Sequence, residues 1–126
     1  MPLVTLTVLK PKTTVFKDTV LAAVHESLVS IGVPEADRFQ RVLELPPEDF
    51  RFDRVYPDVQ GRRSDDFVLI EIVLSVGRSV KVKKQFLAAL LEKLKTAGLH
   101  PEDVMVVFKE TTWENWAFAG GRQIHV

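Results

Sequence analysis

The first third of the chain carries two different hydrophobic periods. Residues 3–9 alternate along an extended chain, which predicts a strand that begins almost at the amino terminus. From Phe16 to Ile31 apolar residues recur at helical spacing, and this predicts a helix that ends at Gly32. After a turn, residues 38–45 hold apolar anchors of moderate regularity, which predicts a second strand. The order is strand, helix, strand.

The same order returns in the second half. Residues 67–76 form an apolar run that predicts a strong strand, and a helical pattern from Val82 to Leu94 follows and stops at Gly98. Residues 104–108 predict a last strand. The two halves therefore predict the same succession of elements.

Positions separated by a constant interval carry the same kind of side chain. At an offset of 66 the pairs include Val4 and Ile70, Lys12 and Arg78, Val24 and Leu90, Gly32 and Gly98, and Asp37 and Asp103. So many matches indicate an internal duplication, with repeats at about residues 2–45 and 68–110. Two βαβ units then join into an α+β fold, a four-stranded sheet with two helices on one face, in a single domain over residues 1–126.

Such a sheet leaves its second face uncovered. The run 67–76 is apolar nearly throughout, so we expect that face to meet something apolar, and another subunit is the natural candidate. Three aromatic residues of the tail, Trp113, Trp116 and Phe118, support an oligomer because so short a tail cannot bury them alone. The connection 46–66 is long for so small a domain, and such connections are often functional or mobile.

Composition narrows the classes of protein. The 126 residues are 46% hydrophobic, enough for one good core, and 17 basic residues balance 17 acidic ones, so no global field favours nucleic acid or an anionic membrane. The absence of cysteine excludes disulfides and thiol chemistry and, with no signal peptide, predicts a cytoplasmic protein. No apolar run is long enough to span a bilayer.

The well-marked enzyme motifs are absent. The sequence contains no phosphate-binding P-loop, no dinucleotide-binding glycine pattern, no zinc-protease motif and no nucleophile elbow. His25, His100 and His125 do not show metal-ligand spacing, so we expect no metal and no cofactor.

The candidate for chemistry is Pro2, which opens the first strand. Removal of Met1, which is usual before a small residue, leaves a prolyl secondary amine held by the sheet. The reference pKa of an α-amino group is about 8. An apolar pocket beside a cation lowers such a pKa toward neutrality, and the amine then serves as base or acid. Met-Pro openings also occur in arbitrary proteins.

Further candidates lie at turns and in the tail. Arg78 stands between the second strong strand and its helix, where a guanidinium can bind a carboxylate or can be an ordinary surface residue. Asp37 precedes the second strand, and it can orient a water or cap a turn. Trp116 and Phe118 lie on one side of an extended segment, as a pocket wall or as interface packing.

These features together resemble the tautomerase superfamily, with malonate semialdehyde decarboxylase as the nearest branch. The resemblance covers the whole chain and includes Met1-Pro2-Leu3-Val4, the duplicated βαβ unit, Pro34-x-x-Asp37, Gly77-Arg78-Ser79 and Asn115-Trp116-x-Phe118. It implies a homotrimer and a catalytic amino-terminal proline. It also implies small keto, enol or halo-acrylate acids as substrates.

Residue by residue, the resemblance implies that Pro2 is the catalytic proline, Asp37 positions water and Arg78 holds the substrate carboxylate. It also implies that Trp116 and Phe118 line the pocket. A second arginine of some decarboxylases falls on Val76 in this chain. The expected function is therefore acid–base catalysis on keto or enol acids, as a tautomerase, decarboxylase or hydratase. The alternative is a non-catalytic trimeric scaffold or binding protein with the same fold.

Overall fold

The elements follow each other as two copies of one unit. The computed structural model describes residues 2–126. The elements are β1 (Leu3–Leu9), α1 (Thr14–Ser30), β2 (Phe39–Leu45), β3 (Val68–Ser75), α2 (Val80–Thr96) and β4 (Val104–Thr111), with short 3-10 helices η1 (Pro101–Asp103) and η2 (Trp113–Asn115). Each half is therefore a βαβ unit, and β4 is followed by a tail.

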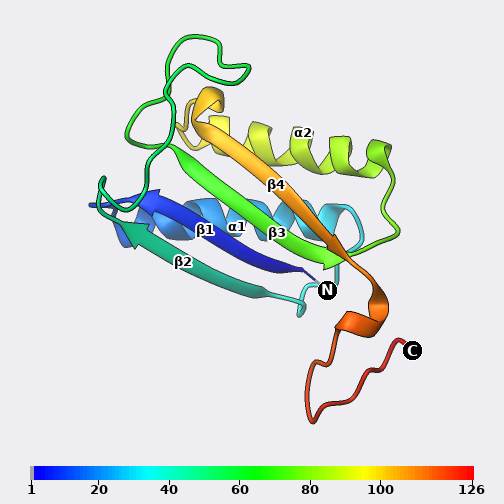
Figure 1. The fold of residues 1–126 in the computed structure, drawn as a ribbon. Coiled ribbons are helices and arrows are strands. Elements are labelled where there is room, and N and C mark those ends of the chain that lie inside the picture. The colour runs from blue at the N-terminus through cyan, green and yellow to red at the C-terminus, as the bar shows by residue number, and fades with distance from the viewer. Residues whose placement is uncertain (1) are drawn as a thin grey trace.

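The four strands form one sheet in the order β2-β1-β3-β4. Within each unit the two strands are parallel, and β1 and β3 join the units as an antiparallel central pair. Both helices pack on the same side of this sheet (Figure 1). This is the fold class that the hydrophobic periods predicted.

The duplication extends to individual hydrogen bonds. Thr13 Oγ1 accepts from the Phe16 N–H at 3.0 Å, and Ser79 Oγ accepts from the Val82 N–H at 3.2 Å, so the same cap begins both helices. After the first strand of each unit, the Lys10 N–H donates to Leu45 O and the Val76 N–H donates to Thr111 O, at 2.8 and 2.9 Å. Each of these contacts has its counterpart 66 residues away.

The core lies between the sheet and the helices. Its fully buried members come from alternate positions of β1 and β3 and from one stripe of each helix: Val4, Leu6, Val8, Ile70, Ile72, Leu74, Val20, Val24, Leu28, Phe86, Leu90 and Leu94. Both helices end before a glycine with positive φ, Gly32 at 107° and Gly98 at 95°. The core residues therefore match the predicted apolar stripes.

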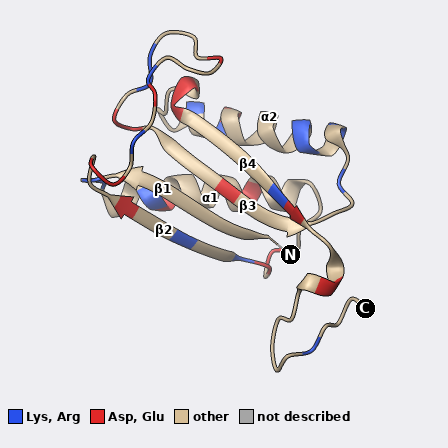
Figure 2. Cartoon of the chain, in the orientation of Figure 1, with Lys and Arg blue, Asp and Glu red and all other residues tan. Residues whose placement is uncertain are grey.

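The opposite sheet face is mixed in character. Thr5, Arg41 and Glu71 are paired in register across its middle, and Lys109 forms an ion pair with Glu71 at 3.1 Å. Figure 2 shows charged positions along β2, β3 and β4. The expectation of an apolar second face is therefore only partly met, because Glu71 of β3 and residues of the neighbouring strands are charged.

The connection from residue 46 to 66 contains neither helix nor strand, but it is packed. Phe50 and Phe52 stack near Phe67, with ring centroids 5.8 and 4.3 Å from it. Arg63 is buried and donates to Asp53 O at 2.8 Å and to Tyr56 O at 2.6 Å. The Arg63 guanidinium thus satisfies backbone carbonyl groups of the same connection.

Several strand boundaries differ from expectation, and β2 begins at Phe39, one residue later than predicted. β4 runs to Thr111, beyond the predicted end at residue 108, because its polar last residues still pair with β3 in register. β3 is shorter than the apolar run by one residue at each end. Among the described residues, no helix combines the length and apolarity needed to cross a membrane.

Candidate active site

The sheet brings Pro2, Asp37 and Arg78 to one end of the molecule. Leu3, directly after Pro2, pairs with Phe39 of β2 and with Val73 of β3. Asp37 precedes β2, and Arg78 follows β3, so all three residues leave the sheet at this end. We call it the proline end, and Figure 1 shows the start of β1 beside the ends of β3 and β4 there.

Pro2 is buried immediately before β1. The strand fixes its position, because β1 is central and hydrogen-bonded on both sides. The prediction that Met1 is removed concerns a residue outside the described part of the chain. The sheet therefore holds Pro2 in a fixed position.

Arg78 is half-buried in the β3–α2 turn. Its guanidinium makes no hydrogen bond or ion pair with any residue between 2 and 126, whereas four of the lysines and Arg54 have a carboxylate partner. α2 begins two residues later with the Ser79 cap. A guanidinium without a carboxylate beside a helix start is suited to an anionic group from outside the chain.

Asp37 is half-buried in the turn before β2. Its N–H donates to Pro34 O at 3.0 Å, which fixes the backbone of the turn. Asp37 thus lies at the proline end, directly before β2 as predicted. Its counterpart Asp103 lies at the opposite end and has a structural role, because it accepts from the Ser64 N–H and hydroxyl at 2.7 and 2.6 Å.

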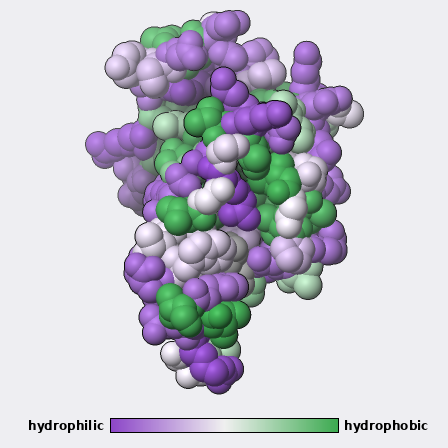
Figure 3. Space-filling view, turned by 90° about the vertical axis from the view of Figure 1, so that its right-hand side faces the viewer, coloured by the Kyte–Doolittle hydropathy of each residue, from purple (hydrophilic) through white to green (hydrophobic). Residues whose placement is uncertain are grey.

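The tail beyond β4 carries an aromatic cluster. Trp116 and Phe118 stack with ring centroids 5.7 Å apart, and His125 contacts Phe118 and Trp113 edge-on. Figure 3 views this side of the molecule and shows apolar patches on the body and on the projecting tail. A hydrogen bond with the Thr112 side chain holds the pKa of Glu114 below its ordinary value. The fold thus brings the two aromatic rings together. Among residues 2–126, no hydrogen bond joins either of them to Pro2 or Arg78.

The sequence did not predict Ser75 as a site residue, and it predicted Trp116 only as an aromatic wall. Ser75 Oγ, at the end of β3, and Trp116 Nε1 are both buried and have no hydrogen-bond partner in residues 2–126. Ser75 is fully buried and Trp116 is 8% exposed. Buried groups of this kind carry a desolvation cost, and in sites they are often completed by a ligand or water. The only signal for Ser75 in the sequence is that it interrupts an apolar run.

Comparison with known proteins shows which family has this arrangement. The sheet, the repeated unit and the placement of Pro2 at a strand start define a tautomerase-like fold. The family model described as tautomerase enzyme matches residues 37–119, more than half of the chain. The chain belongs to the tautomerase enzyme family.

Solved structures agree over almost the whole length. The FG41 malonate semialdehyde decarboxylase inhibited by 3-bromopropiolate is 25% identical, with a TM-score of 0.88 over 98% of this chain and 93% of that one. A second malonate semialdehyde decarboxylase, solved as wild type, as a mutant in which its first residue, a proline, is alanine, and in inactivated form, is 28% identical, with a TM-score of 0.86 over 96% and 93%. A fused 4-OT, a symmetric trimer, shares the fold at 24% identity, with a TM-score of 0.74 over 95% and 94%.

Proposed function

We propose that this protein is a cofactor-independent enzyme that acts on small keto or enol carboxylic acids, with Pro2 as acid–base and Arg78 as the carboxylate-binding residue. The observation that carries the proposal is Arg78, a half-buried residue whose guanidinium has no partner among residues 2–126, at the same sheet end as Pro2. A cation and an amine at fixed positions are what a substrate with a carboxylate and an acidic carbon requires.

In the tautomerase mode the neutral amine of Pro2 removes a proton from the carbon next to a carbonyl. The electron pair moves into the carbonyl, which becomes an enolate, and the ammonium then returns the proton to the enolate oxygen or to the far carbon of a conjugated double bond; ketonisation of an enol acid is the reverse path, with the proton delivered to carbon. Arg78 holds the carboxylate throughout. No atom is lost, and no oxidant is needed.

In the decarboxylase mode the protonated amine donates a hydrogen bond to the carbonyl oxygen. The bond between the carboxylate carbon and the alpha carbon breaks, and its electron pair forms the enolate while carbon dioxide leaves; the alpha carbon then takes a proton. Asp37 directs water in the related hydration. Two neighbours at 25% and 28% identity are malonate semialdehyde decarboxylases, which supports malonate semialdehyde as a substrate to test. Val76 offers no second cation, so the tautomerase mode is tested beside it.

Trp116 and Phe118 complete the proposed site as an apolar wall. The indole N–H of Trp116 is buried without a partner in residues 2–126, and a substrate oxygen would satisfy it. Ser75 Oγ offers a second such group.

We further propose that the protein is a homotrimer. Leu3, Phe39 and Leu43 are exposed by 43%, 48% and 42% on the open sheet face, and a hollow of about 300 Å³ lies among residues of β1, β2 and β3 there. Two structures of fused 4-OT with this fold are a symmetric and an asymmetric trimer. Light scattering coupled to size-exclusion chromatography measures the mass, and a monomer would contradict this part of the proposal.

The test is ketonisation of phenylenolpyruvate and turnover of malonate semialdehyde by the natively processed protein, with Pro2→Ala and Arg78→Ala as variants. Intact mass first establishes whether Met1 is present, because an amide nitrogen at Pro2 is not basic. Loss of activity in both variants supports the proposal. Activity in chains that retain Met1 would exclude the amine mechanism, and an inactive wild type on a panel of keto, enol and halo-acrylate acids would favour a scaffold.

A further inference from the structure

The end of the sheet opposite the proline end also has a hollow, and we call it the lysine end. There β1 ends and β3 begins, and Val8 pairs with Val68. A hollow of about 360 Å³ lies at this end. Its lining includes Phe16, Arg62, Ser64, Asp66, Leu99 and His100.

The two ends correspond position by position. Lys12, in the β1–α1 turn, is the counterpart of Arg78, and both precede a helix with the same type of cap. The counterpart of Pro2 is Val68, whose nitrogen is an internal peptide group. The lysine end therefore has the cation of the proline end but not its amine.

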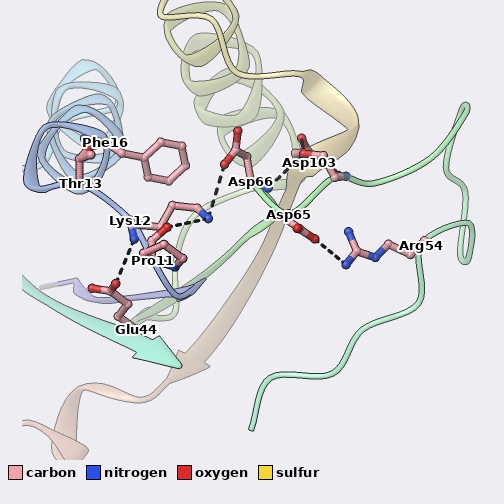
Figure 4. Close-up of polar contacts among 10 residues, drawn as sticks. Pro11, Lys12, Thr13, Phe16, Glu44, Arg54, Asp65, Asp66 and Asp103 are labelled. Carbon is pink, nitrogen blue, oxygen red and sulfur yellow. Dashed lines mark hydrogen bonds and ion pairs between the residues drawn. The ribbon is translucent and has the colours of Figure 1, made fainter. Parts of the chain in front are cut away.

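Lys12 is already positioned to hold a carboxylate. Its side chain is only 8% exposed, and Nζ lies 3.5 Å from Asp66 Oδ1 and 5.8 Å from the centroid of the Phe16 ring (Figure 4). Nζ also donates to Pro11 O at 3.4 Å. The ammonium is thus pre-arranged, and its carboxylate partner lines the hollow.

Asp66 is a replaceable partner. Its side chain is 62% exposed, and the 3.5 Å separation is at the long end for a charge-assisted contact. An ion pair with an exposed member contributes little, because water competes for both charges. A carboxylate from solution can therefore take the place of the Asp66 carboxylate on Lys12.

The surroundings favour a small acid with an apolar part. Phe16 and Leu99 supply apolar walls, and Arg62 and His100 border the hollow. Asp103 also borders it, but both its oxygens accept hydrogen bonds from Ser64, which ties the connection in place. Glu44 is engaged nearby by Lys17 and by the Lys12 N–H at 3.0 Å.

We propose that the lysine end is a second, non-catalytic binding site for small carboxylic acids, in which Lys12 exchanges the carboxylate of Asp66 for that of the ligand. The site arises from the duplication, so it holds the class of anion that the proline end holds without reacting with it. It does not depend on the amine of Pro2. This binding site can therefore be tested independently of the proposed activity.

Amide chemical shifts in a titration of the natively processed protein with malonate test this site. We expect the Ser64 and Gly98 amides to shift saturably, and Lys12→Met to abolish this response while the remaining spectrum stays folded. Lys12→Arg restores it. Arg78→Met is the matched control, which keeps the Ser64 and Gly98 response.

Asp66→Asn is the second test, because it removes the competing charge and leaves intact the hydrogen bond that the Asp66 N–H donates to Ser64 Oγ at 3.0 Å. We expect about a two- to fivefold tighter malonate affinity at the lysine end, the range of an exposed ion pair. No saturable shift at Ser64 and Gly98 in either the wild type or Asp66→Asn would overturn the proposal. A response that survives Lys12→Met would overturn it as well.

Discussion

The two ends of the sheet began as the same structure and now differ in what their charges do. At the lysine end Lys12 is paired with Asp66, and Asp103 is tied to Ser64 by two hydrogen bonds. At the proline end Arg78 has no partner in residues 2–126, and buried polar atoms of Ser75 and Trp116 are unsatisfied within that range. The cation at the lysine end already has a carboxylate partner, which a ligand must displace, whereas the cation at the proline end has none among residues 2–126.

This difference agrees with a general property of functional sites. Stability favours satisfied polar groups, whereas binding requires groups that a ligand can satisfy. The same turn, cap and cation occur at both ends, so neither a turn cation nor a helix start distinguishes a site by itself. The partners of the cation make the distinction.

The largest expected effect separates Arg78 from Lys12. Arg78→Ala should lower kcat/KM on phenylenolpyruvate by about 10²-fold, as expected from the loss of charge-assisted hydrogen bonds to the substrate carboxylate. Lys12→Ala, the matched change at the other end, should leave kcat/KM within a factor of about two, since additivity holds for distant sites. Equal losses in the two variants, measured by steady-state kinetics, would erase the proposed difference between the ends.

The aspartates should show the reverse pattern. Asp103→Asn should destabilise the protein by about 1–3 kcal/mol, because an amide cannot accept both hydrogen bonds that Ser64 donates in this geometry. Asp37→Asn should mainly lower decarboxylase or hydratase turnover. Thermal unfolding and kinetics on the same samples check both; an unchanged melting temperature for Asp103→Asn would contradict the structural role.

Trp116→Phe isolates the indole N–H from the ring. It keeps the stack with Phe118 and should raise KM about threefold or more, the cost of one neutral hydrogen bond to substrate. Phe118→Leu serves as a comparison that alters the wall without removing a donor. If KM for Trp116→Phe stays at the wild-type value, the N–H does not contact the substrate.

The smallest effect concerns acid stability at the lysine end. A hydrogen bond from the Lys17 side chain, followed by one from the Lys12 N–H, holds the pKa of Glu44 below its ordinary value. A depressed folded pKa stabilises the protein above the unfolded pKa, and this contribution is lost as the pH falls through the folded pKa. Glu44→Gln should therefore flatten the pH dependence of unfolding slightly in the acid range below the ordinary pKa of glutamate, and a slope identical to that of the wild type would argue against this contact.

The hydrophobic periods were sufficient to predict the fold because each element repeats its pattern 66 residues later. The positions of Pro2, Asp37 and Arg78 at one sheet end follow from that topology. The mixed open face was not predicted, because Arg41 and Lys109 belong to neighbouring strands and the pattern of β3 contains no information about them. The pairing of Lys12 with Asp66 joins residues far apart in sequence, and only the folded chain reveals it.

The most direct test of the account is to treat the natively processed protein with 3-bromopropiolate, the inhibitor in the related FG41 structure, and to locate the covalent label by peptide mass spectrometry. The account predicts loss of activity in step with labelling of the Pro2 nitrogen, only in chains that lack Met1. Labelling of Lys12 in its place, or inactivation of chains that retain Met1, would contradict it.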